Sequence, residues 1–105
     1  MIQSKNKFGK IVIANPFGLA PMVDVSNIAF RELVEYCGAP GIFYSEMLNV
    51  RMLPNEKLNQ SDYYNIGDIK TPIIFQLLGN ELDKFLLSLE KLKKDNISAI
   101  DINMG

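Results

Sequence analysis

The chain has 105 residues, the usual size of one domain, and its 48% hydrophobic and 22% charged residues are typical of a globular protein. Eleven basic and twelve acidic residues give a net charge of −1, which excludes a protein that binds nucleic acid through a large basic excess. A single cysteine and no histidine exclude an internal disulfide, a zinc cluster and a Ser-His-Asp or Cys-His catalytic centre within these residues.

Targeting signals are missing from the sequence. No apolar run approaches the roughly 20 residues of a membrane helix, and the lysines near the amino terminus precede no apolar stretch long enough for a secretory signal. We therefore expect a cytoplasmic protein without a membrane segment, and nothing in the sequence implies a protein partner.

The amino-terminal stretch predicts a strand, a turn and a second strand. Residues 10–14 are rich in β-branched side chains, Asn15-Pro16 is a turn signal, and residues 17–23 resume an extended apolar run. Because Pro21 has no backbone N–H to donate, we expect it at a strand end or against a ligand.

A helix is predicted over residues 27–37, with Ser26 as its N-cap and Gly38 at its end. Its apolar residues recur at helical spacing, which predicts one buried stripe of Phe30, Leu33, Val34 and Cys37. We therefore expect the Cys37 thiol to be buried and structural, not nucleophilic.

The rest of the chain alternates strands and helices. The pattern predicts strands over residues 41–46, 72–78 and 99–103, a helix over 81–94 and a polar connection over 47–70 with a weak helix near 54–60. The second helix should bury Leu82, Phe85, Leu86, Leu89 and Leu92. Such alternation predicts right-handed crossovers and a parallel sheet. The sequence stops at a strand that has the composition of a buried strand, with no following helix to cover it. We therefore expect this chain to be the amino-terminal part of something larger.

Polar residues inside these apolar strands are candidates for a site. Gln76, Asp101 and Asn103 interrupt their strands, and Gln76 and Asn103 lie near the carboxyl ends, where α/β folds build their sites. Gln76 could equally bond a neighbouring backbone group, and Asp101 is expected to be paired within the fold.

Three further residue sets leave alternatives open. The Pro21-Met22 pair could lie against a flat aromatic ring, although a core role for Met22 fits the pattern better. Glu46 could be a base, a substrate contact or a solvated rim charge, and the last is expected. Tyr63 and Tyr64 could stack on a base or pack at the surface.

Five motifs occur in a fixed order between Leu19 and the last residue, within a resemblance that begins at about Ile11. They are Leu19-Ala20-Pro21-Met22-Val23-Asp24-Val25-Ser26, Phe30-Arg31, Tyr44-Ser45-Glu46-Met47, Phe75-Gln76-Leu77-Leu78-Gly79 and Asp101-Ile102-Asn103-Met104-Gly105. In this order and spacing they resemble the motifs of tRNA-dihydrouridine synthases, and the last motif is the most diagnostic.

The resemblance implies a fold and an activity. Residues 1–105 would be the amino-terminal portion of an FMN-binding TIM (β/α)8 barrel, an incomplete barrel preceded by a short β-hairpin, without the helical tRNA-binding domain. The whole protein would be an oxidoreductase in which NADPH reduces FMN, the flavin passes a hydride to C6 of a uracil in tRNA, and a cysteine protonates C5.

The resemblance also assigns residues. Pro21, Met22 and Val23 match the segment along the flavin ring, Gln76 matches a glutamine that hydrogen-bonds the isoalloxazine, and Asn103 matches an asparagine beside flavin and uracil. The family's catalytic cysteine is expected just beyond Gly105, so that this chain would carry no catalytic residue and be inactive alone. Two alternatives are a fragment of another FMN-dependent TIM-barrel oxidoreductase acting on a small molecule, and a non-catalytic α/β binding module.

Overall fold

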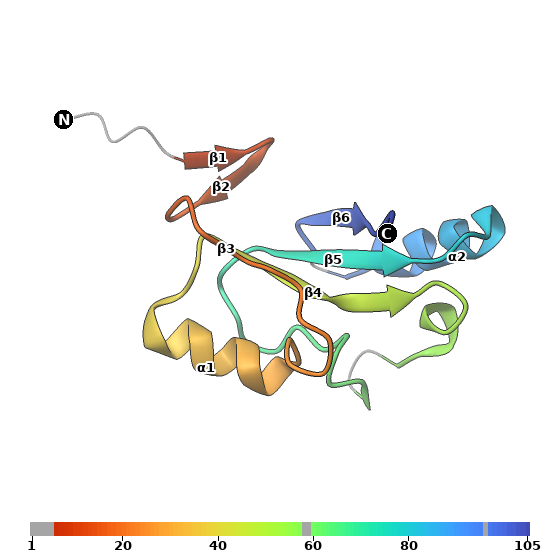
Figure 1. Ribbon diagram of the computed structural model, residues 1–105, viewed down its shortest axis with the longest axis horizontal. Coiled ribbons are helices and arrows are strands. Elements are labelled where there is room, and N and C mark those ends of the chain that lie inside the picture. Colours follow the sequence, from red (N-terminus) through yellow and green to blue (C-terminus); the bar gives the residue numbers. More distant parts are fainter. Residues whose placement is uncertain (1–5, 58–59, 96) are drawn as a thin grey trace.

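The computed structural model of the protein describes residues 6–57, 60–95 and 97–105, and its centre is a four-stranded parallel sheet. The strands lie in the order β3 (Gly18–Leu19), β4 (Ile42–Asn49), β5 (Ile73–Leu78) and β6 (Ala99–Ile102). Their carboxyl ends meet at one edge of the sheet, on the right in Figure 1. The predicted parallel sheet is therefore confirmed, and its mixed α/β arrangement is compatible with part of a TIM barrel.

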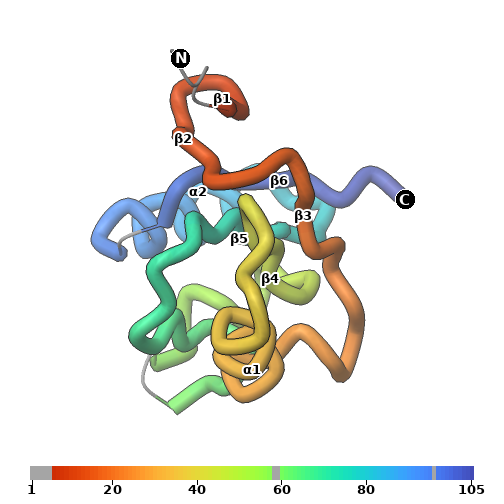
Figure 2. Tube along the Cα trace, turned by 90° about the vertical axis from the view of Figure 1, so that its left-hand side faces the viewer, coloured from red at the N-terminus to blue at the C-terminus, as the bar shows by residue number. Residues whose placement is uncertain are grey.

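A separate hairpin precedes the sheet. Strands β1 (Asn6–Phe8) and β2 (Ile11–Ile13) pair antiparallel around a turn at Gly9, whose φ of 60° is a conformation that glycine adopts without strain. A hairpin was predicted, but with its turn at Asn15-Pro16. That position is wrong, because the turn lies at Gly9 and the chain at Asn15-Pro16 leads from β2 into the parallel sheet. Figure 2 shows the hairpin and the first helix on opposite sides of the strands.

Strand β3 is far shorter than the predicted extended run of residues 17–23, and Pro21 lies just after it, at a strand end as expected. A close approach of two segments fixes its place. The Gly41 amide donates to the Phe17 carbonyl over 2.8 Å, and a side chain at residue 41 would overlap the Asn15 carbonyl oxygen. Glycine therefore lets β3 lie directly beside the start of β4.

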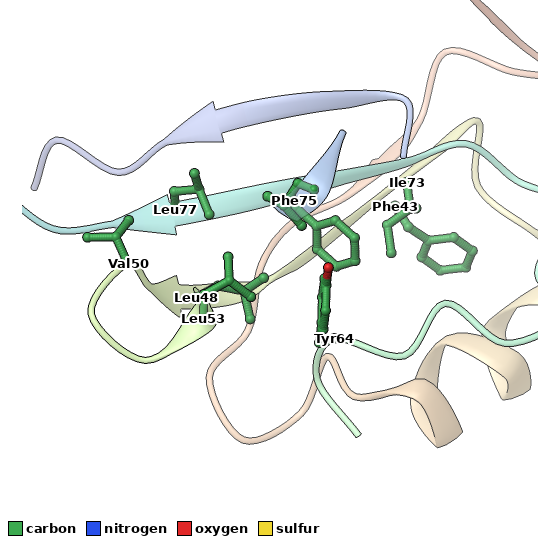
Figure 3. Close-up of a cluster of buried hydrophobic side chains, with 9 residues drawn as sticks. Phe43, Leu48, Val50, Leu53, Tyr64, Ile73, Phe75 and Leu77 are labelled. Carbon is green, nitrogen blue, oxygen red and sulfur yellow. The ribbon is translucent and has the colours of Figure 1, made fainter. Parts of the chain in front are cut away.

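One face of the sheet carries the hydrophobic core (Figure 3). The odd-numbered residues of β5, which are Ile73, Phe75 and Leu77, point to this face together with Phe43 of β4. Side chains from the connection after β4 and from the second helix cover them. The buried members of the core are Phe43, Leu48, Val50, Leu53, Tyr64, Ile73, Phe75, Leu77 and Leu92.

Helix α1 (Ile28–Gly38) forms where it was predicted, but its cap and its buried residues differ. Asn27, not Ser26, caps it by accepting from the Phe30 amide over 3.0 Å. The predicted stripe is wrong at Leu33, which is 59% exposed, and at Cys37, whose thiol is also exposed. The one fully buried residue of α1 is instead Arg31.

Helix α2 (Leu82–Leu92) is also rotated relative to its predicted stripe. Leu92 and Ser88 are buried and Phe85 and Leu89 are half-buried, whereas Leu82 is 74% exposed and Leu86 is 54% exposed. The exposed leucines line a groove of about 610 Å³ with Leu78, Ile102 and Met104. The described part of the chain therefore presents an apolar surface between α2 and the end of β6.

The connection between β4 and β5 is ordered by its own buried side chains. It contains one turn of 3-10 helix, η1 (Leu53–Asn55), which lies slightly before the predicted weak helix. Tyr64 packs into the core, with its ring centre 5.5 Å from that of Phe75, so this tyrosine is neither a stacking platform nor a surface residue. Among the described helices, none is long and apolar enough to cross a membrane.

Candidate functional site

The alternation of β5 places Gln76 on the face opposite the hydrophobic core. Phe75 and Leu77 point to the helix-covered side, so that residue 76 between them points to the other side. Its register partner on β6 is Asp101, and Asn103 follows on the same face near the end of that strand. The structure therefore brings these three candidate site residues together on one face of the sheet.

The three polar side chains form one hydrogen-bonded network. Gln76 Nε2 donates to Asp101 Oδ2 over 2.6 Å, and Asn103 Nδ2 donates to Gln76 Oε1 over 3.3 Å. Asp101 is thus paired within the fold, as expected. All three residues are half-buried, so the network is fixed by the protein while part of it still reaches the surface.

Met47 joins this network because of an irregularity in β4. The register shifts between Tyr44, which is opposite Ile74, and Met47, which is opposite Gln76. The extra β4 residue is typical of a β-bulge, which re-aims the side chains that follow it. Asn103 Nδ2 lies 2.9 Å from the Met47 sulfur as a result. Strict alternation from Tyr44 would have placed Glu46 opposite Gln76, so this contact could not be predicted from the pattern.

A tight turn follows β3 at the same carboxyl edge of the sheet. The Ser26 and Val25 amides donate to the Met22 carbonyl over 2.9 and 3.1 Å, and the Met22 amide donates to the Ser26 hydroxyl over 2.8 Å. Pro21 and Met22 are half-buried and Val23 is exposed. The structure therefore presents residues 21–23 on a closed turn, one strand away from the strand pair that carries Gln76 and Asn103.

Glu46 is a site residue that the sequence analysis missed, since it was expected to be a solvated rim charge. It is only 7% exposed, and its Oε1 accepts from the Asp24 amide over 2.6 Å. Its second oxygen, Oε2, is buried and has no hydrogen-bond partner among the described residues. The carboxylate of β4 therefore holds the turn after β3.

Arg31 is the second missed residue. Its Nη1 and Nη2 each donate over 2.5 Å, to the carbonyls of Ser26 and Asn65. Burial lowers the pKa of the Arg31 guanidinium, and the nearby Glu46 carboxylate partly offsets that shift. The position of Arg31 after Phe30 in a motif was a signal, but helical periodicity placed it off the buried stripe.

The donor set of this face fits a planar ligand with a polar edge. An amide side chain offers two N–H donors and an oxygen with two lone pairs. In Gln76, one N–H is used by Asp101 and one lone pair by Asn103, which leaves a donor and an acceptor available. The half-buried Met22 adds a soft apolar surface of the kind that packs against aromatic rings. These residues suit the isoalloxazine of FMN.

No described group of three or more acidic or cysteine residues could hold a metal ion. Cys37 ends α1 at the amino-terminal edge of the sheet, because β4 begins at Ile42 only a few residues later. Its thiol therefore lies at the edge opposite Gln76 and Asn103, and cannot act at their site.

Comparison with known proteins gives one consistent result. The family model described as "Dihydrouridine synthase (Dus)" matches residues 18–105. The tRNA-dihydrouridine(16/17) synthase of Saccharomyces cerevisiae, named with NAD(P)(+), is 32% identical over 90 residues. This alignment covers 83% of the chain and 21% of the yeast protein.

Two bacterial relatives give the same picture. The probable tRNA-dihydrouridine synthase 2 of Bacillus subtilis is 29% identical, and the probable tRNA-dihydrouridine synthase of Staphylococcus epidermidis is 30% identical, each over 91 residues. Both alignments cover 85% of the chain and 28% of the relative, so the chain spans about a quarter of the length of these proteins. No solved structure matches the chain significantly. The family model covers the parallel sheet, both helices and the whole polar network, and the chain therefore belongs to the dihydrouridine synthase family.

Proposed function

We propose that the protein containing this chain is an FMN-dependent tRNA-dihydrouridine synthase, which uses NADPH to reduce the 5,6 double bond of a uracil in tRNA. The observation that carries the proposal is the pair of hydrogen-bonded amides, Gln76 and Asn103, on the face opposite the hydrophobic core of a sheet whose sequence belongs to the dihydrouridine synthase family. The names of the matched relatives support the choice of tRNA as substrate and of a nicotinamide donor.

The geometry supports a separate role in flavin binding for each of these residues. Gln76 would hold the polar edge of the flavin with its remaining donor and acceptor, while Pro21, Met22 and Val23 would line the ring from the turn after β3, with β4 between them and β5. Asn103, which is bonded to Gln76, would contact the ring and the target base. When bound, FMN would supply the hydride chemistry, and these residues would orient it.

No residue of this chain is proposed as the acid of the reaction. Cys37 lies at the wrong edge of the sheet, and Glu46 is occupied by the Asp24 amide. We propose that the acid is a cysteine outside residues 1–105, and that this chain is the amino-terminal part of an FMN-binding barrel. A base must leave its stack to reach such a site, so the proposal requires an extruded uridine.

The test is an activity assay on the whole protein that contains this chain. The protein is incubated with FMN, NADPH and an unmodified tRNA transcript, and the digested nucleosides are analysed by mass spectrometry. Dihydrouridine formation that requires NADPH is expected. Flavin that is reduced by NADPH but reoxidised only by small unsaturated carbonyl compounds, with every uridine intact, would contradict the proposal and favour a small-molecule oxidoreductase.

A further inference from the structure

The turn after β3 has two external anchors, and both are buried. From β4, Glu46 Oε1 accepts from the Asp24 amide over 2.6 Å. From α1, Arg31 Nη1 donates to the Ser26 carbonyl over 2.5 Å. Hydrogen bonds with a charged partner are roughly twice as strong as neutral ones, so each of these two contacts is stronger than a single bond within the turn.

The backbone at the Glu46 anchor needs such support. Asp24 has a φ of 61°, the only positive φ among the described residues other than glycine. An L-residue adopts this left-handed conformation at an energetic cost, and persists in it only where surrounding contacts impose it. The Glu46 carboxylate binds the amide of that same residue, and therefore imposes the conformation on residues 21–24.

Both anchors, Arg31 and Glu46, are charged side chains buried inside the protein. Arg31 is fully buried and Glu46 nearly so, and each keeps one polar atom without a partner among the described residues, Nε of Arg31 and Oε2 of Glu46. Buried charges are costly unless they are compensated. Their opposite charges compensate each other across the turn that they hold.

We propose that Glu46 and Arg31 are positioning residues that fix the Pro21–Ser26 turn, and so set the distance of Pro21, Met22 and Val23 from the ligand bound at Gln76. The inference rests on the proposed flavin site, because it names FMN as that ligand. Neither residue touches the ligand, and each acts through a backbone group of the turn.

The decisive variant is Glu46→Gln, which keeps the size of the side chain and removes its charge. Its matched control is Glu90→Gln, the same change at an exposed position of α2. Amide hydrogen exchange and FMN affinity are measured for both variants and for the wild type. For Glu46→Gln we expect the Asp24 amide to exchange at least tenfold faster and the Kd for FMN to rise at least fivefold, with β5 amides unchanged. The control should match the wild type in both.

Two results would overturn the inference. One is wild-type exchange at Asp24 in Glu46→Gln, and the other is faster exchange with unchanged FMN affinity. If Glu46→Gln does not fold, the wild type decides: a through-hydrogen-bond coupling between the Asp24 nitrogen and Glu46 Cδ, and slower Asp24 exchange with FMN bound, are both expected, and absence of either overturns it. If the wild type binds no FMN, the proposed function is contradicted. The exchange rate of the Asp24 amide then still tests whether Glu46 holds the turn.

Discussion

Arg31 and Tyr64 are the two largest side chains that the fold buries completely, and both carry polar groups. Tyr64 donates its hydroxyl to Asp95, and the Lys91 ammonium lies 5.7 Å from the centre of its ring. Arg31 bonds two carbonyls from separate loops. At the residue scale, the packing of this domain is therefore organised by polar anchors inside an apolar core, and two predictions test them.

Replacing Arg31 by methionine should be strongly destabilising. The variant leaves the carbonyls of Ser26 and Asn65 without their donor and removes the positive charge near the buried Glu46 carboxylate, so we expect a loss of about 3–5 kcal/mol in the free energy of unfolding. The control is Arg51→Met, which removes an exposed ion pair with Glu81 and should cost at most about 1 kcal/mol. Urea unfolding measures both, and equal losses would contradict the anchoring role.

Replacing Tyr64 by phenylalanine should remove a loss of folding stability that the wild type shows at alkaline pH. Burial, followed by the hydrogen bond to Asp95, raises the pKa of the Tyr64 hydroxyl above its ordinary value. A raised folded-state pKa contributes stability below the unfolded value of about 10, and that contribution is lost as pH rises further. Tyr64→Phe should therefore be less stable than the wild type near neutral pH, by about 1–3 kcal/mol.

The difference between Tyr64→Phe and the wild type should then begin to shrink at about pH 10, the unfolded-state pKa, and keep shrinking as pH rises toward the raised folded-state pKa. Tyr63→Phe, at the exposed neighbouring position, is the control and should leave this pH dependence intact. Urea unfolding across the pH range checks both variants, and a difference that stays constant would show that the Tyr64 hydroxyl is not held as described.

At the scale of elements, the existence of each helix and strand in the parallel sheet could be predicted, but the faces of the helices could not. Helical periodicity grouped Leu82 and Leu86 with Leu92, because it detects apolar spacing and contains no information about which neighbours exist. The core contacts Phe85, Leu89 and Leu92 of that stripe and leaves Leu82 and Leu86 exposed. Similarly, the Ser26 hydroxyl was available as a helix cap, but the Met22 amide engages it and Asn27 caps the helix.

The rotated face of α2 makes a direct prediction about two leucines on one helix. Leu92→Ala removes a side chain that is 1% exposed and should cost about 2–5 kcal/mol. Leu86→Ala, at a position 54% exposed, should change the free energy of unfolding by about 0.5 kcal/mol or less. Thermal or urea unfolding of the pair measures the contrast, and similar losses would place Leu86 in the core after all.

At the scale of the whole molecule, strand order brings together residues that are distant in the sequence. The parallel order puts the ends of β3, β4, β5 and β6 at one edge, so that Gln76 and Asn103 could be predicted as neighbours from alternation and topology alone. Glu46 and Met47 could not, because a bulge in β4 shifts which residue faces Gln76. The amino-acid composition of a strand does not reveal a bulge, and the positions of Glu46 and Met47 both depend on the bulge in β4.

The central claim is that Gln76 holds a flavin on the face of the sheet opposite the hydrophobic core, and the binding of FMN to variants of the whole protein tests it most directly. Gln76→Leu replaces the amide by an apolar group of similar size, whereas Gln60→Leu makes the same change at an exposed position of the connection. Fluorescence titration should give a Kd for FMN at least tenfold higher for Gln76→Leu and unchanged for Gln60→Leu. Wild-type affinity in a correctly folded Gln76→Leu protein would contradict the account.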